Sequence, residues 1–410
     1  MLTFFKITKL IKKIKFFITN KKLKTSLYLK IYSYVFAPFF YPFGIIFFFL
    51  KIRLINIIWI DAIGHICLEP DCFLREKSLN KKINYKGLIL APKNKIANKY
   101  FLNYLKKHFI VISSPILCFL LSPLKKINYI NHDISKYCMD IYSTAKQYEL
   151  IAKTYDKENF FNLTHIDQCI GYEILEKIGI KKNDWFVTIH SRDPYYRNLG
   201  NYTVRDSNIE SYKKMIEYII SIGGFVLRMG SNKTEKLIIN NKNFIDYANS
   251  NIRSEMMDIF LCAKSKIFIG TNSGLNNLPL LFKTPILYLN LVPLSQLNSQ
   301  PNSLGVPKLL RKKKDGKFLK FNEALQEPFG NSFFDKTFND AGLEVIDNDS
   351  DLILDCTIEA LQRLNGSFVE SQIDKNLQIN FKSLLKPGHY GYGTSGIIST
   401  TFLRKYQNLF

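Results

Sequence analysis

Five short apolar runs between residues 185 and 290 alternate with segments of helical or turn pattern. Each run is short enough to be a buried strand, and segment 207–224 between the first two repeats its apolar residues at helical spacing. Strands that alternate with helices form parallel sheets, because each crossover covers one face of the sheet. The pattern predicts a Rossmann-like half with the strands DWFVTIH, FVLRMG, FIDYA, KIFIGTNSG and PILYLN.

Two serines in this half have the position of helix caps. Ser207 stands three residues before Glu210, the spacing of a capping box, and Ser254 precedes the apolar stretch 255–264. Beyond residue 295 the sequence predicts a hairpin turning at Asp315 and Gly316, a strand followed by a capped helix in 343–366, and a terminal helix over 398–410.

A second series of strands precedes this half. NIIWIDAIGHI predicts a strand that enters a turn, and GLILAP and HFIVISS predict two more, with a helix over NKYFLNYLKK between them. A chain of 410 residues is longer than one core usually supports, so two α/β domains are expected. We assign a basic, apolar segment to 1–55, an N-terminal Rossmann-like domain to 56–180, a C-terminal Rossmann-like domain to 181–345 and a helical extension to 346–410.

The segment 31–50 has twenty residues without a charge and follows an arm, residues 1–30, with nine Lys and no acid. Its length suits a bilayer span, but Pro38, Pro42, Gly44 and the many aromatic residues favour a segment lying in the membrane interface. A true span, a buried core segment and a signal peptide are the alternatives. Interfacial attachment to an anionic membrane would leave the protein on the cytoplasmic face of the inner membrane.

The net charge of +23 is concentrated, because residues 1–30 and 307–320 supply 15 of it. The basic charge makes nucleic-acid binding an alternative function. Its concentration in two stretches and the lack of an RNP or helix-turn-helix signature argue against it, and we expect no nucleic-acid partner. The seven cysteines form no CxxC pair and no zinc-finger spacing, which fits free thiols in a reduced compartment.

Polar residues follow several predicted strands of the second half. In an open parallel sheet the carboxyl ends of the strands line one crevice, where ligands bind. Four strand ends would thus offer polar groups to one ligand. The residues are His190, Arg192 and Asp193, then Arg228 and Gly230, then Asp246 and Tyr247, then Asn272, Ser273 and Gly274.

Arginine is scarce in this chain, and four of its ten residues (Arg192, Arg197, Arg205 and Arg228) lie between 192 and 228. A guanidinium is a permanently charged planar fork that suits phosphate, and the TNSG turn before a helix offers backbone N–H groups. These features predict a diphosphate site. The alternative is that the arginines pair with Asp193, Asp206 and Asp246 and only fix loops.

The absence of other motifs narrows the ligand. The sequence has no GxGxxG after a strand, no GxxxxGK[ST] and no HExxH, so neither a dinucleotide cofactor, a P-loop nor a bound metal is expected. A nucleotide whose phosphates are held by arginine remains, and a second substrate would use the other half. This combination predicts a nucleotide-sugar glycosyltransferase without a cofactor.

The blocks HSRDPYYRN, GFVLRMG, IDYANSNIRSEMMDIFL and FIGTNSGLNNLPLLFKTPILYLN resemble those of a family of bacterial surface-polysaccharide glycosyltransferases. AIGHICLEPDCFL and ISTTFLRKYQNLF are similar to the ends of that family, so the likeness spans about residues 57 to 410. More distantly, His190-x-Arg192 resembles the HxR motif of O-fucosyl and α1,6-fucosyltransferases, although Asp193 replaces the Thr-Asp that often follows. The resemblance implies a metal-independent enzyme with the GT-B fold, in which two Rossmann-like domains with parallel sheets face a cleft.

The resemblance also implies a sugar acceptor, a surface polysaccharide or a lipid-linked glycan, held by the N-terminal half, with donor phosphates on Arg192. A base must then accept the proton of the acceptor hydroxyl, and His65, Glu69 and Asp71 are the candidates; all three could instead stabilise a loop. Asn198 is a candidate sugar contact by family likeness alone. Tyr195, Tyr196 and Tyr202 would stack on the sugar or base, or simply pack. A catalytically inactive scaffold in polysaccharide assembly is the further alternative.

Overall fold

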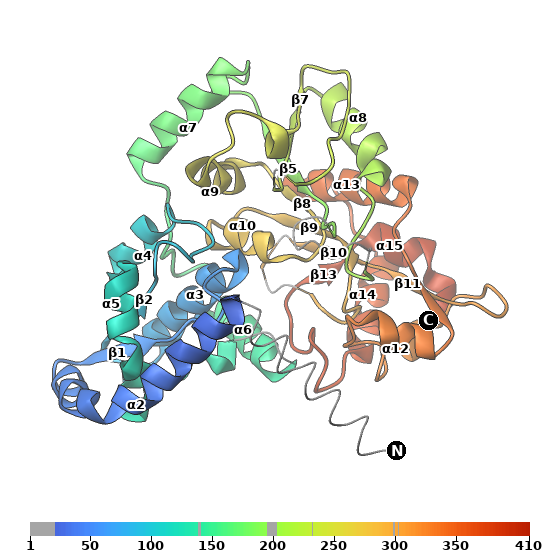
Figure 1. The fold of residues 1–410 in the computed structure, drawn as a ribbon. Coiled ribbons are helices and arrows are strands. Elements are labelled where there is room, and N and C mark those ends of the chain that lie inside the picture. The colour runs from blue at the N-terminus through green and yellow to red at the C-terminus, as the bar shows by residue number, and fades with distance from the viewer. Residues whose placement is uncertain (1–20, 138–140, 195–202, 232, 298–299, 302) are drawn as a thin grey trace. The chain divides into compact units, whose positions relative to one another are not determined.

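A computed structural model of the chain describes residues 21–137, 141–194, 203–231, 233–297, 300–301 and 303–410 (Figure 1). Residue contacts divide the chain into two compact units. Unit 1 comprises Met1–Asp61 and Lys81–Ile134, and unit 2 comprises Ala62–Asn80 and Ser135–Phe410. The sequence places residues 62–80 and 135–180 in an N-terminal domain, whereas their contacts place them in unit 2, because helix α3 (Ile63–Leu79) packs on α10 (Asn277–Leu281) and α6 (Ile141–Thr154).

The strands described in unit 1 form one parallel sheet of four, in the order β3–β2–β1–β4. Two of the three predicted strands are confirmed, but the strand expected from residue 56 is wrong. The sheet takes residues 52–55 instead, because Leu54 and Ile55 are buried in its centre and turns follow them. The bounds are β1 Ile52–Ile55, β2 Lys86–Leu90, β3 Ile110–Ile112 and β4 Asn131–His132.

The helices of unit 1 pack on this sheet through a core that includes Leu88, Leu124 and Ile127. The longest described helix, α2, covers Lys21–Phe49 and contains Pro38 and Pro42. By length and composition alone, its part Tyr28–Phe49 is apolar enough to cross a membrane. The others are α4 Leu102–His108, α5 Pro115–Leu120, η1 Ser122–Lys126 and η2 Asn128–Ile130.

Unit 2 is built on a parallel sheet that has seven strands in the part of the chain described, in the order β13–β10–β9–β8–β5–β6–β7. The five predicted strands are confirmed, and their order β9–β8–β5–β6–β7 is that of a Rossmann-like half. The α/β class is as predicted, and two parallel sheets of this kind are GT-B-like. The bounds are β5 Phe186–His190, β6 Phe225–Arg228, β7 Phe244–Ile245, β8 Phe268–Gly270, β9 Ile286–Leu291, β10 Leu304–Pro307 and β13 Ile397–Ile398.

The predicted helix caps of unit 2 have different outcomes. Ser254 caps α9 (Glu255–Lys264) by accepting a hydrogen bond from the Met257 N–H, as predicted. The capping box at Ser207 is wrong, because Ser207 is buried against Ser191, and Asn208 accepts from the Glu210 N–H instead. The remaining described helices before β10 are η3 Ser135–Tyr137, α7 His165–Lys177, η5 Ile209–Tyr212, α8 Lys213–Ser221, η6 Tyr247–Asn249 and η7 Gly274–Asn276.

The C-terminal part of unit 2 contains strands as well as helices. The chain reverses at Asp315 and Gly316 as predicted, but β11 (Leu309–Lys312) pairs along its length with the distant β12 (Leu343–Ile346). Strand β13 adds an edge to the main sheet beside β10, so residues 346–410 are part of the α/β core. The helices here are α11 Phe321–Ala324, α12 Asp335–Asp340, α13 Ser350–Leu364, α14 Gln372–Leu384, α15 Thr400–Lys405 and η8 Gln407–Leu409.

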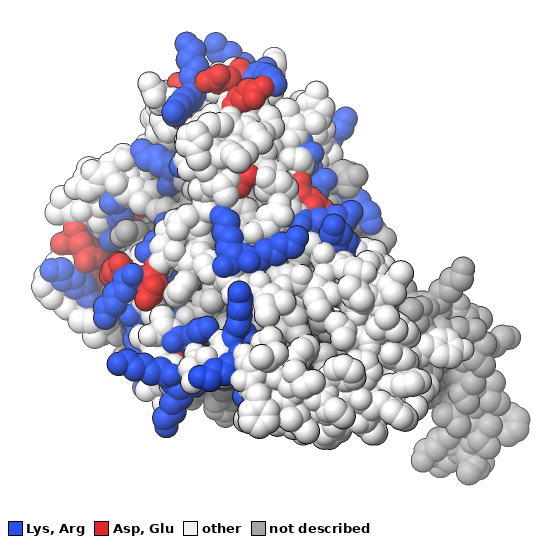
Figure 2. All heavy atoms as spheres, turned by 90° about the vertical axis from the view of Figure 1, so that its left-hand side faces the viewer, with Lys and Arg blue, Asp and Glu red and all other residues white. Residues whose placement is uncertain are grey.

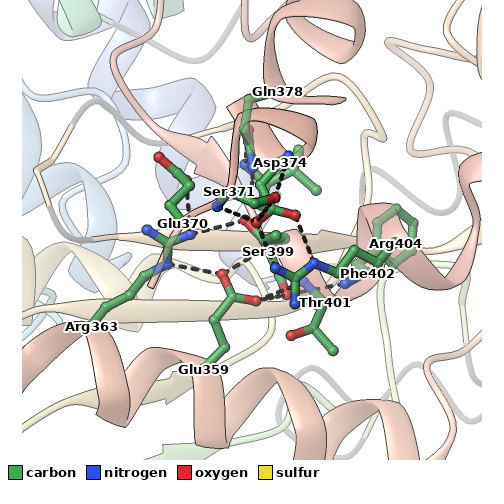
Figure 3. Close-up of polar contacts among 12 residues, drawn as sticks. Glu359, Arg363, Glu370, Ser371, Asp374, Gln378, Ser399, Thr401, Phe402 and Arg404 are labelled. Carbon is green, nitrogen blue, oxygen red and sulfur yellow. Dashed lines mark hydrogen bonds and ion pairs between the residues drawn. The ribbon is translucent and has the colours of Figure 1, made fainter. Parts of the chain in front are cut away.

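A buried polar network fastens these last helices (Figure 3). Glu359 on α13 is 1% exposed and accepts hydrogen bonds from the Ser399 hydroxyl at 2.6 Å and the Thr401 N–H at 2.9 Å. Asp374 on α14 accepts from the Arg404 guanidinium through both oxygens, at 2.6 and 2.5 Å. Burial of these carboxylates is tolerated because each is met by several donors.

Candidate functional site

The ends of β5 and β8 are joined at the carboxyl edge of the unit 2 sheet. The Thr271 N–H donates to the His190 carbonyl oxygen at 3.1 Å, and the Arg192 N–H donates to the Thr271 hydroxyl at 2.9 Å. A Cβ atom on Gly270 would lie 2.2 Å from the His190 carbonyl oxygen, so only glycine fits there. The two strand ends predicted to meet therefore do so.

His190 is the last residue of β5 and is half-buried. Nδ1 lies 3.4 Å from the Met229 carbonyl oxygen, which can accept a hydrogen bond from the Nδ1–H group. Burial, together with the charges of Arg228 and Arg192, lowers the pKa of His190 to about 4, although the Met229 carbonyl and Asp193 oppose the shift. At neutral pH His190 is thus an uncharged neighbour of two guanidinium groups.

Arg192 keeps part of its side chain at the surface. Its guanidinium Nε lies 3.1 Å from Oδ1 of Asp206, and its side chain is 19% exposed while that of Asp206 is fully buried. One edge of the guanidinium is thus fixed by a buried carboxylate. Asp193, which follows, is half-buried and close enough to His190 to affect its pKa.

The loop that follows β5 is closed at its base. The Ser191 hydroxyl donates to the Ser207 carbonyl oxygen at 2.6 Å, and the Lys308 ammonium donates to the carbonyl oxygens of Val204 and Asp206, both at 2.8 Å. Lys308 belongs to the basic stretch 307–320 of the sequence and is only 3% exposed. The predicted contacts Tyr195, Tyr196, Arg197, Asn198 and Tyr202 lie outside the described residues.

Arg228 and Asp246 face each other in the interior. Arg228 is 2% exposed; its NH1 group donates to the Glu235 carbonyl oxygen and lies 3.5 Å from Oδ2 of Asp246. The same Asp246 oxygen accepts from the Leu237 N–H at 3.2 Å. This is the loop-fixing arrangement that the sequence left open as the alternative for Arg228.

Tyr247 and Gly230 also lie in this region. The Tyr247 hydroxyl donates to Oδ1 of Asp258 at 2.8 Å and accepts from the Ser254 N–H at 3.2 Å, and the side chain is fully buried. Burial, followed by the Asp258 charge, raises the pKa of Tyr247. Gly230 has φ +155°, and its carbonyl oxygen accepts from Arg253 Nε at 3.2 Å. In this structure Tyr247 braces the start of α9.

The turn after β8 is braced by amide side chains. The Asn272 side-chain amide donates to the Val292 carbonyl oxygen at 2.6 Å, and the Ser273 hydroxyl donates to Oδ1 of Asn276 at 3.3 Å. Arg205 donates to the Asn272 carbonyl oxygen at 3.3 Å. Gly274 is exposed, whereas Asn272 is buried, so the turn presents Ser273 and Gly274 at its surface.

Helix α3 begins against this turn, a contact that the sequence did not predict. A Cβ atom on Gly64 would lie 2.8 Å from the Gly274 Cα atom, and the Asn277 side-chain amide donates to the Gly64 carbonyl oxygen at 3.1 Å. His65 lies in the first turn of α3 and not in a loop after a strand, as the sequence suggested. The paired glycines are thus the signal that sequence reasoning missed.

His65 and Glu69, proposed as competing bases, form one pair. Nδ1 of His65 lies 2.5 Å from Oε1 of Glu69, with His65 24% and Glu69 1% exposed. Asp71 is instead bonded to Arg75 at 2.6 Å, and both are buried. A buried carboxylate that accepts from Nδ1 directs the basic lone pair of the imidazole to Nε2. Asp71 serves the packing of α3.

No group of three or more His, Cys, Asp or Glu side chains that could hold a metal ion occurs among the described residues. Neither a protein-family model nor a curated protein matches the chain. A solved structure, the glycosyl transferase family 9 protein from Veillonella parvula DSM 2008, aligns over 58% of this chain and 80% of its own, with TM-score 0.38 and 9% identity. Likeness at this level assigns neither a family nor an activity.

Proposed function

We propose that this protein is a nucleotide-sugar glycosyltransferase whose donor diphosphate lies at the carboxyl edge of the unit 2 sheet. The observation that carries the proposal is that three segments meet there: the end of β5 with Arg192, the turn after β8 with Gly274, and the first turn of α3 with His65. Sugar transfer requires groups that bind the diphosphate and a group that accepts a proton. A guanidinium and a turn with an exposed glycine can serve the first purpose, and an imidazole backed by a carboxylate can serve the second.

In this proposal Arg192 contacts the diphosphate. The leaving group gains negative charge as the bond between the anomeric carbon and the phosphate oxygen breaks, and a fixed guanidinium stabilises that charge without a metal ion. Asp206 and Thr271 hold Arg192 in place. The buried Arg228, with Asp246, acts as a positioning residue for the loop after β6, and the neutral His190 lies near enough to both arginines for their charges to affect its pKa.

His65 is the proposed general base. The acceptor hydroxyl oxygen bonds to the anomeric carbon, its proton passes to Nε2 of His65, and the bonding electron pair leaves with the phosphate. Glu69 fixes the tautomer and stabilises the imidazolium that forms. The proposed acceptor is a surface polysaccharide or a lipid-linked glycan. In this proposal the apolar helix α2 attaches the protein to the cytoplasmic face of the inner membrane, where it meets the acceptor.

The test is donor binding followed by transfer. Purified full-length protein is heated with UDP, GDP, CMP, ADP and their sugars; a ligand at about 100 times its Kd adds about 2.7 kcal/mol of stability. With the responding donor, Arg192→Ala should lower kcat by about 10² to 10³. Arg311→Ala is the matched control, because Arg311 is a surface residue paired with Glu344. No response to any nucleotide, or an unaltered kcat in a folded Arg192→Ala protein, contradicts the proposal.

A further inference from the structure

Helix α2 packs on the other elements of unit 1 along one narrow stripe, and the rest of its apolar surface is uncovered. Its buried and half-buried positions include Ser33, Ala37, Phe40, Gly44 and Phe47, which repeat at alternating spacings of four and three; Leu29 and Tyr32 are half-buried as well. The Ser33 and Ser122 hydroxyls are 2.9 Å apart, and the Tyr129 hydroxyl donates to the Tyr41 carbonyl oxygen at 2.8 Å. On the other sides lie large exposed side chains, among them Tyr34, Val35, Phe39, Phe43, Ile46 and Phe49.

Helix α5, far away in the sequence, continues this apolar surface. The Tyr32 and Phe119 rings stack with their centroids 4.4 Å apart, and the Tyr32 hydroxyl donates to the Leu120 carbonyl oxygen at 3.3 Å. Beside this contact Ile116 is 71% exposed and Leu117 49%. We call the exposed apolar side chains of α2 and α5 together the two-helix face. A contiguous exposed apolar surface that extends over two helices of a folded unit marks an interaction site.

The charge of unit 1 identifies the partner. Its residues include 21 Lys and Arg but two acids, Asp61 and Asp133, so it carries +19 of the net +23 of the chain. The side of the molecule turned to the viewer in Figure 2, on which α2 and α5 lie in Figure 1, has at lower right a broad area without charged side chains, with Lys and Arg gathered beside it. Apolar area flanked by cations complements an anionic lipid surface.

Cationic groups accompany α2 along its length, which distinguishes lying on the membrane from spanning it. The Lys126 ammonium lies 3.9 Å from the Tyr34 ring centre, and the Arg53 guanidinium lies 4.2 Å from that of Phe48. Tyr34 and Phe48 are separated by about 21 Å of helix, less than the roughly 30 Å of a bilayer core. A spanning α2 would carry these cations, and strand β1 packed behind it, into hydrocarbon.

We propose that the two-helix face seats unit 1 in the interface of an anionic bilayer, with α2 parallel to the membrane plane and α5 inserted beside it. This inference rests on the membrane location given in the proposed function and not on the transfer reaction. Ile116 and Leu117, which come some 70 residues after the apolar segment 31–50, therefore also bind the membrane, together with α2.

Vesicle flotation of the full-length protein tests the role of α5 without donor or acceptor. We expect flotation with vesicles of phosphatidylglycerol and phosphatidylethanolamine, and weaker flotation with phosphatidylcholine alone. The double variant Ile116→Asp, Leu117→Asp should reduce the bound fraction at least about tenfold, because two large apolar side chains leave the lipid. Val369→Asp, Ile373→Asp is the matched control, since both residues are exposed in unit 2. Unchanged flotation of the α5 variant overturns the proposal.

A label that adds no charge separates insertion from misfolding. A polarity-sensitive fluorophore is attached at Ile116→Cys, in a Cys138→Ser, Cys169→Ser background that leaves only cysteines buried in the structure. Its emission should rise and shift to the blue with anionic vesicles, whereas the same label at Val369→Cys should not respond. An unresponsive label at position 116, or binding to duplex nucleic acid without flotation, would refute the lipid as partner. Nucleotide binding by the same protein is scored separately, so either proposal can fail alone.

Discussion

Nδ1 of His65 and Oε1 of Glu69 lie 2.5 Å apart on successive turns of α3, with the carboxylate buried and the imidazole a quarter exposed. The spacing of four residues puts both side chains on one face of the helix. A buried carboxylate behind an imidazole is the arrangement in which histidine serves as a general base, since the carboxylate stabilises the charged ring. The pair therefore combines two residues that the sequence offered as rivals.

His65→Gln should lower kcat by about 10² to 10⁴, because the hydroxyl proton loses its acceptor. A base must be unprotonated to act, so the wild-type rate should fall as the pH decreases, and this acid limb should disappear in the variant. Glu69→Gln should also reduce kcat, because the imidazole loses the carboxylate that fixes its tautomer. His165→Gln, at an exposed position on α7, is the control and should behave as wild type. A pH–rate profile unaffected by His65→Gln would remove it from the mechanism.

Gly64→Ala should destabilise the protein by about 1 to 3 kcal/mol, although alanine favours helices. The added Cβ atom would lie 2.8 Å from the Gly274 Cα atom, and backbone cannot move aside as a side chain can. Denaturant unfolding measures the change, and transfer activity should fall with it because the same contact places His65. Ser78→Ala, an exposed position near the end of α3, adds helix propensity without a clash and should be neutral or stabilising. Equal stability of the two variants would contradict the contact.

Local patterns predicted the unit 2 sheet well, because its strands are short apolar runs and parallel pairing follows from their alternation with helices. The cap at Ser254 was predictable for the same reason, since its hydrogen bond lies within one turn. The cap at Ser207 failed because Ser191, sixteen residues earlier, takes its hydroxyl. Sequence spacing carries no record of that tertiary contact.

The position of His65 was wrong for a related reason. Gly64 and Pro70 both weaken a helix locally, and the aromatic and β-branched residues before them suit a strand. Burial outweighs these preferences, because Cys67, Cys72 and Phe73 on α3 are almost completely buried. Arg228 shows the same limit. The sequence pattern of an arginine at a strand end is the same whether the arginine faces a ligand or, as here, a backbone carbonyl and a half-buried carboxylate.

Glu359→Ala should destabilise the protein by about 3 to 5 kcal/mol, the cost of removing one partner from a buried charged network. Arg363 would lose one of its acceptors, at 2.9 Å, and the N–H groups of the buried Thr400 and the half-buried Thr401 would lose theirs. Urea unfolding measures the loss. Glu344→Ala is the control, because Glu344 is 47% exposed in its pair with Arg311 and should change stability by less than about 1 kcal/mol. Similar values for both variants would mean that the network in Figure 3 does not hold the C-terminal helices.

Asp374 should make the protein lose stability as the pH falls below about 5. Hydrogen bonds from Arg404, opposed by burial and supported by Ser371, depress the pKa of Asp374 in the folded state. An unfolded aspartate has a pKa of about 3.9, so the stabilisation is complete well above that value, begins to fall as the pH approaches it, and is gone once acid also protonates the folded carboxylate. Asp374→Asn should cost about 1 to 3 kcal/mol at pH 7 and show a flatter decline between pH 5 and 3. Asp340→Asn, an exposed carboxylate paired with Lys336, should leave the wild-type pH dependence intact; parallel curves for wild type and Asp374→Asn would mean that the Arg404 pair contributes nothing to folding.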